Sequence, residues 1–322
     1  MRAAGPPPLC CTVISHLVSV APSYDQQLSY TLRELLPTGW DWGMTILVTG
    51  ATGSVGRLLV DELVAAGVRD VRALTNNPAK AALPSGVEVA HGYLGKPATL
   101  PAALDGVDTV YLAPLPAYVD EFVTAAQKAG VRRVVVLSGE PAEYEAQGDP
   151  GSWHYYKVER AIEDGGFEWV HLRPGQFMNN TLDWAPSIKA EGVVRGPYAD
   201  AVQLPIDLGD IAAVASAVLR DESYTGQKLG MSGPEQLTQP QEVALIGEAL
   251  GRELRFEELT HEEAVAAWTP FMGAESAEWL VDGFRMMAEY AAEPSPVVQE
   301  VAGRPAKSYR EWARDNVAAF RG

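Results

Sequence analysis

A glycine-rich loop between a strand pattern and a helix pattern is the feature that most constrains the fold of this chain. The apolar run at residues 45–48 leads into Gly50, Gly53 and Gly56, and an amphipathic helical pattern follows at once. Gly50 permits the tight turn, Gly53 lets a diphosphate approach the backbone, and Gly56 lets the helix pack against the strand. The free N–H groups at the helix start favour an anion. The residues expected to bind the diphosphate are Gly50, Thr52, Gly53, Ser54, Val55 and Gly56.

Strand and helix patterns alternate through the first half of the chain. Strands separated by helices pair in parallel through right-handed crossovers, and valine-rich runs suit strands covered on both faces. We therefore predict an α/β fold with a doubly wound parallel sheet of the Rossmann type, which binds ligands beyond the carboxyl ends of its strands. Further strands are predicted at residues 71–74, 87–90, 109–113, 133–137 and 169–172, with helices at 98–104, 118–130 and 153–163.

The pattern changes after Pro174, where helices dominate. The expected domains are an irregular extension at 1–43, a nucleotide-binding domain at 44–175 that takes return elements from later residues, and a smaller, mostly helical substrate lobe at 176–322. Because Met44 directly precedes the first strand, the functional domain is expected to begin there; a weak export or membrane signal in the extension is the alternative. Helices are predicted at residues 210–219, 240–250, 261–268, 274–290 and 309–320, with short extended pieces at 192–194, 203–206 and 227–231.

Composition limits the partners. The chain has 322 residues, with 25 Lys and Arg against 42 Asp and Glu and a formal net charge of −17. Nucleic acids and anionic membranes are bound through clustered basic residues, and no basic run is present, so neither is expected as a partner. The two cysteines are the adjacent Cys10 and Cys11, so we expect no disulfide after Met44, no metal site and a reducing, cytoplasmic location. No apolar run approaches the ~20 residues that span a bilayer.

Several motifs occur together and in order along residues 44–320. Together they resemble the NmrA-like group of atypical short-chain dehydrogenases. The resemblance implies a Rossmann domain that binds NAD(P), with a site between that domain and the carboxyl-terminal lobe. It covers several activities, from quinone, ketone and enone reductases to nucleotide sensors without turnover. The motifs are Gly-Ala-Thr-Gly at 50–53, Val-Val-Val-Leu-Ser at 134–138, Lys-Val-Glu at 157–159, Leu-Arg-Pro-Gly at 172–175, Asp-Ile-Ala at 210–212, Ser-Gly-Pro at 232–234 and Gly-Arg-Pro at 303–305.

The expected cofactor is NADP(H), with NAD(H) as the alternative. An NAD-binding unit places Asp or Glu about 20 residues past the glycines, where this chain has Asn76, with Lys80 nearby. No carboxylate is therefore present there to repel a 2′-phosphate. Members of the group often carry Gly-Asp-Leu after the third strand, and here Tyr93 replaces the Asp. Further cofactor contacts are expected at Tyr93, Leu94, Ala113, Pro114, Ser138, Lys157, Pro174, Gly175 and Phe177.

The resemblance also implies a catalytic Ser after the fifth strand and a Tyr-x-x-x-Lys motif on the next helix. Ser138 and Lys157 match the Ser and the Lys, but the position four residues before Lys157 is Trp153. An indole N–H is not a general acid, so the proton donor is expected elsewhere. His154 and Tyr155 are the candidates for it, and helix capping or packing is the structural alternative for both.

We therefore expect an NAD(P)H-dependent oxidoreductase that reduces a small apolar or aromatic acceptor, such as a quinone, ketone or enone, as a monomer or homodimer. A quinone needs less proton assistance than a simple ketone and tolerates the missing Tyr. Two alternatives stay open: a non-catalytic NAD(P) sensor, motivated by Trp153, and an epimerase or dehydratase, for which the usual Tyr is absent as well. The apolar residues expected either to line the site or to form core are Trp184, Trp268, Phe271, Met272, Trp279, Phe284, Met286 and Met287.

Overall fold

The computed structural model describes residues 44–148 and 154–321 of the chain. The expectations for the extension at 1–43, for its two cysteines and for Trp153 lie outside these described residues. Residues Met44–Gly322 form a unit of their own.

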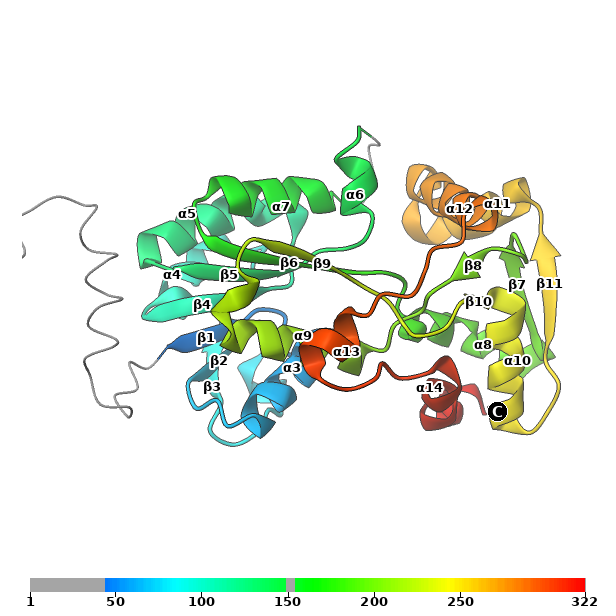
Figure 1. The fold of residues 1–322 in the computed structure, drawn as a ribbon, viewed down its shortest axis with the longest axis horizontal. Coiled ribbons are helices and arrows are strands. Elements are labelled where there is room, and N and C mark those ends of the chain that lie inside the picture. Colours follow the sequence, from blue (N-terminus) through cyan, green and yellow to red (C-terminus); the bar gives the residue numbers. More distant parts are fainter. Residues whose placement is uncertain (1–43, 149–153, 322) are drawn as a thin grey trace, which may run out of the picture. The chain divides into compact units, whose positions relative to one another are not determined.

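In the described residues, the principal sheet has seven strands, and every neighbouring pair is parallel. Their order is β3-β2-β1-β4-β5-β6-β9. The order reverses between β1 and β4, which is where a doubly wound sheet opens a crevice for a ligand. The predicted fold class is confirmed (Figure 1). The strands are β1 (Thr45–Val48), β2 (Val71–Thr75), β3 (Glu88–His91), β4 (Val107–Leu112), β5 (Arg133–Leu137), β6 (Glu168–Pro174) and β9 (Gln227–Met231).

Helices cover both faces of this sheet, and each face has its own hydrophobic core. One core joins α3 (Ser54–Ala65), α9 (Leu208–Arg220) and α13 (Val297–Ala302) to the sheet. The other core joins α4 (Leu100–Leu104), α5 (Val119–Ala129) and α7 (Tyr155–Asp164). Figure 1 shows α5 and α7 on one side of the strands and α3 and α9 on the other. The valine run of β5 is completely buried between the two layers, as a strand covered on both faces should be.

A third core, built around Trp312, lies in the carboxyl-terminal half. It gathers α8 (Ala185–Glu191), α10 (Gln239–Leu250) and α14 (Tyr309–Asp315). Two small sheets complete this region: β7 (Val193–Pro197) pairs in parallel with β11 (Arg255–Leu259), and β8 (Val202–Gln203) pairs with β10 (Leu237–Thr238). The helices α11 (His261–Met272) and α12 (Ala274–Glu289) pack against each other, and the short α6 (Ala142–Glu145) follows β5.

Several elements differ from the expectation, and α6, α8 and β10 have no predicted counterpart. The piece predicted at 227–231 is not an isolated extended segment, because β9 joins the principal sheet beside β6. Strand β11 and helix α13 were not predicted. The strand reads Arg-Phe-Glu-Glu-Leu and is half exposed, so it lacks a continuous apolar signal, and the helix has only six residues after Pro296. Isolated segments this short carry little intrinsic preference, and their packing decides the structure.

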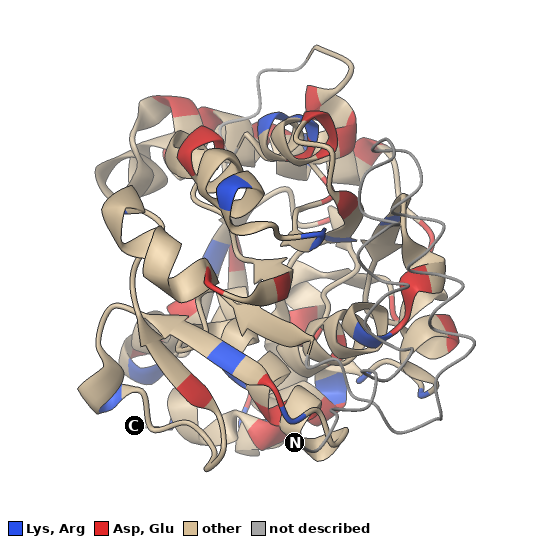
Figure 2. Cartoon of the chain, turned by 90° about the vertical axis from the view of Figure 1, so that its left-hand side faces the viewer, with Lys and Arg blue, Asp and Glu red and all other residues tan. Residues whose placement is uncertain are grey.

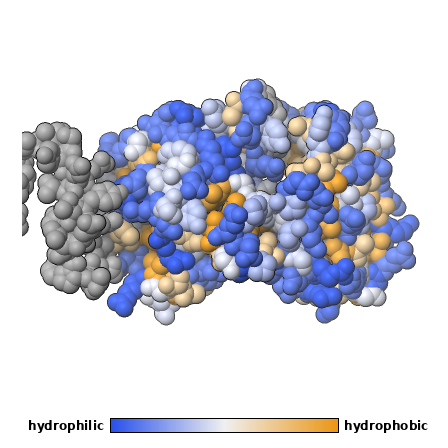
Figure 3. All heavy atoms as spheres, viewed as in Figure 1, coloured by the Kyte–Doolittle hydropathy of each residue, from blue (hydrophilic) through white to orange (hydrophobic). Residues whose placement is uncertain are grey.

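The exterior agrees with the acidic composition. Figure 2 shows Asp and Glu spread over the helices and loops of the described part, with Lys and Arg among them. On the face drawn in Figure 3, hydrophilic residues predominate and hydrophobic ones form small areas. Among the described residues, no helix is both long and apolar enough to span a bilayer.

Candidate functional site

The glycine loop has the geometry that a diphosphate requires. Gly50 has a φ of +60°, which places it in the left-handed region, and its carbonyl oxygen accepts a hydrogen bond from the Gly53 N–H at 2.8 Å. Gly53 is the N-cap residue directly before α3, and its backbone is extended. A Cβ on Gly56 would overlap the carbonyl group of Gly50. The turn is therefore closed so tightly over the start of α3 that only hydrogen fits at position 56, and the first N–H groups of α3, at Ser54 and Val55, follow the turn directly.

The loops after β1 and β4 are held together beside this turn. Thr49 Oγ1 accepts a hydrogen bond from the Ala113 N–H at 2.8 Å, and a Cβ on Gly50 would lie 3.2 Å from that of Ala113. Pro114 and Leu94 both line a small apolar depression nearby. The structure thus brings the predicted residues Gly50, Ala113, Pro114 and Leu94 to the carboxyl edge of the sheet.

Around Asn76 and Asn77, where the adenosine end of the cofactor is expected, the structure separates two nearby cations, Lys80 and Arg72. Lys80 ends the short 3-10 helix Pro78–Lys80 and is exposed. Arg72 instead points toward the opposite side of β2, where it donates to the Ala103 and Asp105 carbonyl oxygens. Arg57, which sequence reasoning missed, donates to the carbonyl oxygens of residues 81 and 82 and so places a guanidinium between α3 and this segment.

Three further predicted residues, Thr52, Asn76 and Tyr93, lie in the loops that follow β1, β2 and β3. The exposed Asn76 lies in the turn after β2, which the neighbouring Asn77 N–H stabilises by donating to Thr75 Oγ1 at 3.2 Å. The hydroxyl of Thr52 in the glycine loop lies 3.4 Å from the same Thr75 Oγ1. The partly exposed Tyr93 ring covers Gly95.

At the reactive end, Ser138 belongs to a buried ion-pair network. Its hydroxyl donates to Glu159 Oε1 at 2.6 Å, and Arg173 donates to both oxygens of the same carboxylate, at 2.9 and 2.7 Å. Arg173 also donates to Glu143 at 2.6 Å. Burial alone would raise the pKa of Glu159, but the hydrogen bonds from Arg173 and Ser138 outweigh it and hold that pKa below its usual value. The Ser138 hydroxyl is therefore committed to positioning the loop between β5 and α7.

The other three predicted catalytic residues lie at different places on or before α7. The Lys157 ammonium is 4.0 Å from Asp120 at the start of α5, and its side chain is 55% exposed. The Tyr155 ring lies against Gly139, directly after Ser138. His154 precedes the helix with a φ of +57° and is exposed. The structure thus brings Tyr155 close to the Ser138 segment, while Lys157 faces the α5 side of the sheet edge.

A large cavity opens at the carboxyl ends of β5, β6 and β9. Its volume is about 650 Å³, which is ample for a drug-sized aromatic molecule. The sheet side is formed by residues such as Glu140, Gly175 and Met231, and α12 supplies the opposite wall with Trp279 and Met286. Both α6 and α12 are labelled in Figure 1. Because β1, β4, β5 and β6 run in parallel, the glycine loop and this cavity share one edge of the sheet.

The segment at the end of β6 links the sheet edge that carries the glycine loop to the cavity. Gly175 lines the cavity, its N–H donates to the Met231 carbonyl oxygen at 3.0 Å, and the Pro174 carbonyl oxygen accepts from the Glu140 N–H at 3.1 Å. Phe177 forms an isolated bridge with Ile206 and is partly buried against the core that contains α3, α9 and α13. Pro174 and Gly175 therefore stand where the sheet edge meets the cavity.

Two carboxyl groups on the cavity wall have raised pKa values. Glu140 follows Gly139 at the end of β5, and burial raises its pKa. Burial is also the main cause that raises the pKa of Glu145, although its Oε2 accepts a hydrogen bond from the Tyr156 N–H at 2.7 Å. The Oε1 atom of Glu145 is buried and has no hydrogen-bond partner among the described residues. Sequence reasoning missed both acids, because Glu140 lies in the connection after β5 and Glu145 ends the four-residue helix α6, which is too short to show a periodicity.

The predicted apolar residues of the carboxyl half have different environments. Trp279, Met286 and Met287 line the cavity. Trp184 packs against the third core, and Trp268 lies 5.8 Å from Phe284, centroid to centroid. Phe271 is 86% exposed, and Met272 is exposed as well. Of these predicted apolar residues, only Trp279, Met286 and Met287, all on α12, contribute to the cavity wall.

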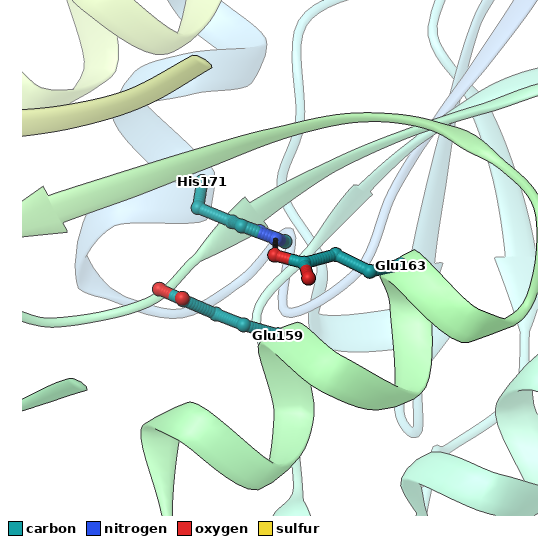
Figure 4. A group of neighbouring side chains, drawn as sticks. All are labelled: Glu159, Glu163 and His171. Atoms are coloured by element: carbon teal, nitrogen blue, oxygen red, sulfur yellow. Dashed lines mark hydrogen bonds and ion pairs between the residues drawn. The ribbon is translucent and has the colours of Figure 1, made fainter. Parts of the chain in front are cut away.

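A cluster of metal-ligand type lies next to the Ser138 network. Glu159, Glu163 and His171 each offer one ligand atom, and these three atoms lie within 4.8 Å of one another (Figure 4). The Lys228 ammonium, however, is 3.1 Å from Glu163, and Arg173 is bidentate on Glu159. Burial lowers the pKa of His171 to about 4, which keeps the ring neutral at pH 7. The two carboxylates are thus neutralised by protein cations, and the cluster joins α7 to β6 and β9.

Comparison with known proteins places the chain in a family. The model of the NmrA-like family matches residues 43–315. The (4-alkanoyl-5-oxo-2,5-dihydrofuran-3-yl)methyl phosphate reductase of Streptomyces griseus is 40% identical over 280 residues, which cover 85% of this chain and 99% of the relative. The NAD(P)H azoreductase of Xenophilus azovorans is 33% identical over 285 residues, with coverage of 85% and 99%.

A solved structure agrees with this assignment. The NADPH-dependent quinone oxidoreductase of Escherichia coli matches with a TM-score of 0.73 and 25% sequence identity, covering 84% of this chain and 99% of that one. The resemblance inferred from the motifs is thereby confirmed. With its parallel sheet, its closed glycine loop and a family match over most of its length, the chain belongs to the NmrA-like family.

Proposed function

We propose that the protein is an NAD(P)H-dependent oxidoreductase that transfers a hydride to a small organic acceptor. The observation that carries the proposal is the position of the glycine loop and the 650 Å³ cavity on one edge of the parallel sheet. The names of the relatives agree, since they describe a furanone phosphate reductase, an azoreductase and a quinone oxidoreductase. Quinones, ketones and enones are the acceptor classes that we propose.

The chain's own residues fit a dinucleotide. The turn leaves no space for a Cβ at Gly56 and little at Gly50 and Gly53, and it presents the start of α3 to a diphosphate. At the adenosine end, the guanidinium of Arg57 and the exposed Lys80 provide positive charge, and Asn76 stands where NAD-specific chains have a carboxylate. We therefore propose NADP(H) as the preferred cofactor.

The residues around the reactive edge have separate tasks in this mechanism. When bound, the reduced nicotinamide supplies the hydride. Lys157, beside the start of α5, is proposed to hold the nicotinamide ribose, and Ser138 positions the β5–α7 connection through Glu159. The cavity walls exclude water and orient the acceptor. A neutral quinone or enone also needs one proton, for which Tyr155, His154 and the cavity acids Glu140 and Glu145 are the nearby sources.

An acceptor panel with the full chain tests this function. We expect loss of nicotinamide absorbance with a neutral naphthoquinone or an enone, and a lower KM for NADPH than for NADH. Lys157→Met should raise the dissociation constant of NADPH by about tenfold, the effect of one charge-assisted hydrogen bond. The exposed Lys128→Met on α5 is the matched control and should leave it unchanged. Tight dinucleotide binding without turnover of any acceptor would instead favour a non-catalytic sensor.

A further inference from the structure

The acceptor cavity carries an excess of negative charge. Its wall includes the carboxylates of Glu140, Glu145, Asp282 and Glu293 but only two cations, Arg173 and Arg285. Both cations are already paired with carboxylates. Arg173 binds Glu159 and Glu143, and Arg285 lies 3.1 Å from Asp282 and 3.2 Å from Glu289. Neither guanidinium therefore offers an unpaired charge to an anionic ligand.

The acids are less well paired than the cations. Among residues 44–148 and 154–321, neither Glu140 nor Glu145 forms an ion pair with Lys or Arg, and Glu145 Oε1 is buried without a hydrogen-bond partner. A buried oxygen of this kind is costly unless a donor reaches it. The Tyr156 N–H reaches the other oxygen of this carboxylate, so a bound molecule that brings a donor or a positive charge to Oε1 would be favoured here.

The remaining wall suits a flat aromatic molecule. Its large apolar or aromatic side chains include Tyr144, Leu204, Met231, Trp279, Met286, Met287 and Tyr290. Aromatic faces attract cations as well as other rings, and thioethers adapt to irregular aromatic shapes. Gln203 is a further unsatisfied group, because it lines the cavity and neither its amide oxygen nor its nitrogen has a partner among the described residues.

We propose that this cavity selects planar aromatic acceptors that carry a positive charge and discriminates against anionic ones, including phosphate esters. The inference rests on the proposed reductase function and names its substrate class. The positive group would lie beside Glu140 and Glu145, and the ring would lie among the residues of α12. A furanone phosphate, the substrate named for the Streptomyces griseus relative, would face carboxylates here.

The proposal also suits the missing Tyr of the Tyr-x-x-x-Lys motif. A neutral quinone takes up a hydride and a proton, so NADPH, quinone and one proton give NADP⁺ and hydroquinone. An acceptor with a delocalised positive charge takes up the hydride alone. One C–H bond forms, the cation becomes a neutral molecule, and NADPH becomes NADP⁺. No general acid is needed for this step.

Charge-matched acceptors test the inference. One naphthoquinone is compared in three forms: unsubstituted, with a trimethylammoniomethyl group and with a sulfomethyl group, so that the spacer keeps the reduction potentials similar. We expect kcat/KM for the cationic form to exceed that for the anionic form by at least about tenfold at low salt, and the ratio to fall as salt rises. Glu140→Gln and Glu145→Gln should each lower this ratio several-fold.

Controls separate the charge effect from folding and from the function itself. Glu253→Gln removes the same charge from an exposed loop outside the cavity and should keep the ratio of the unchanged protein. Quenching of tryptophan fluorescence by unreactive aromatic ammonium and sulfonate ligands measures the same preference without turnover. Equal kcat/KM for the three quinones, with equal binding of the two unreactive ligands, would overturn the inference and leave the reductase function intact. Failure of every acceptor would count against the function.

Discussion

Gly56 shows how one residue can decide whether a dinucleotide binds. Its hydrogen is the only substituent that fits, because a Cβ would overlap the carbonyl group of Gly50. That carbonyl oxygen also accepts from the Gly53 N–H, so any movement of residue 50 opens the turn. The contact joins the first strand to α3 at the point where the diphosphate is proposed to bind.

We predict that Gly56→Ala weakens both the fold and the cofactor site. Forcing a methyl group into this contact should cost about 1 to 3 kcal/mol of unfolding free energy and should weaken NADPH binding by at least about tenfold, measured by thermal unfolding and calorimetry. Gly283→Ala on α12 is the matched helical glycine, since an added Cβ meets nothing there. It should keep NADPH affinity and change stability by at most about 1 kcal/mol. Wild-type NADPH affinity in Gly56→Ala would contradict this account of the turn.

Glu159 is the second residue whose substitution should have a large effect on stability. It is completely buried and accepts from Ser138 and from two nitrogens of Arg173. Glu159→Gln leaves the Arg173 charge without its buried partner and should reduce the free energy of unfolding by about 3 to 5 kcal/mol. Glu143→Gln removes the exposed partner of the same guanidinium and should cost at most about 1 kcal/mol. Similar costs for the two variants in denaturant unfolding would refute this assignment.

At the scale of elements, helix α10 carries an unusual buried acid. Glu242 is completely buried, and neither of its carboxyl oxygens has a hydrogen-bond partner among the described residues. Burial raises its pKa to about 8, so the group is neutral at pH 7. Burial raises the pKa of Tyr309, the first residue of α14, and a negative charge on Glu242 would raise that pKa further. The packing of α10 on α14 is therefore weakened as the pH rises.

The sign of this effect follows from linkage. The folded-state pKa of Glu242, about 8, lies above its reference value of 4.5. The folded state then holds the proton more tightly, so this stability is complete below pH 4.5 and is lost as the pH rises toward 8. The loss amounts to about 5 kcal/mol. Glu242→Gln should remove it, so the variant gains stability relative to wild type between pH 4.5 and 8 in denaturant unfolding. Parallel stability curves for the two proteins would exclude this role.

At the scale of the whole molecule, local patterns predicted the nucleotide half well. The glycine loop, the valine run of β5 and the helix ending at Gly130 each carry their signal within a few residues, and the structure has all three. The participation of β9 in the sheet could not be predicted, because its pairing with β6 is made across more than fifty residues. Strand β11 depends on the same kind of distant partner, β7.

The candidate site was less predictable than the fold. Backbone requirements such as that of Gly56 leave a motif, whereas the cavity acids Glu140 and Glu145 are recognisable only once α12 covers the sheet edge. The hydrogen bond that holds the Ser138 hydroxyl likewise depends on Glu159, twenty-one residues later. The roles proposed for Lys157, His154 and Tyr155 stay predictions, as do the domain boundary near residue 175, the oligomeric state and the cytoplasmic location.

Transfer of a labelled hydride tests the central claim most directly. The full chain is incubated with an enone and NADPH that carries deuterium at the transferable position of the nicotinamide, and the product is analysed by mass spectrometry. The account predicts that one deuterium appears on carbon in the reduced enone for each NADPH consumed. Folded protein that binds NADPH but gives no reduced product from enones, quinones or ketones, or a product whose new C–H bond carries no deuterium, would contradict it.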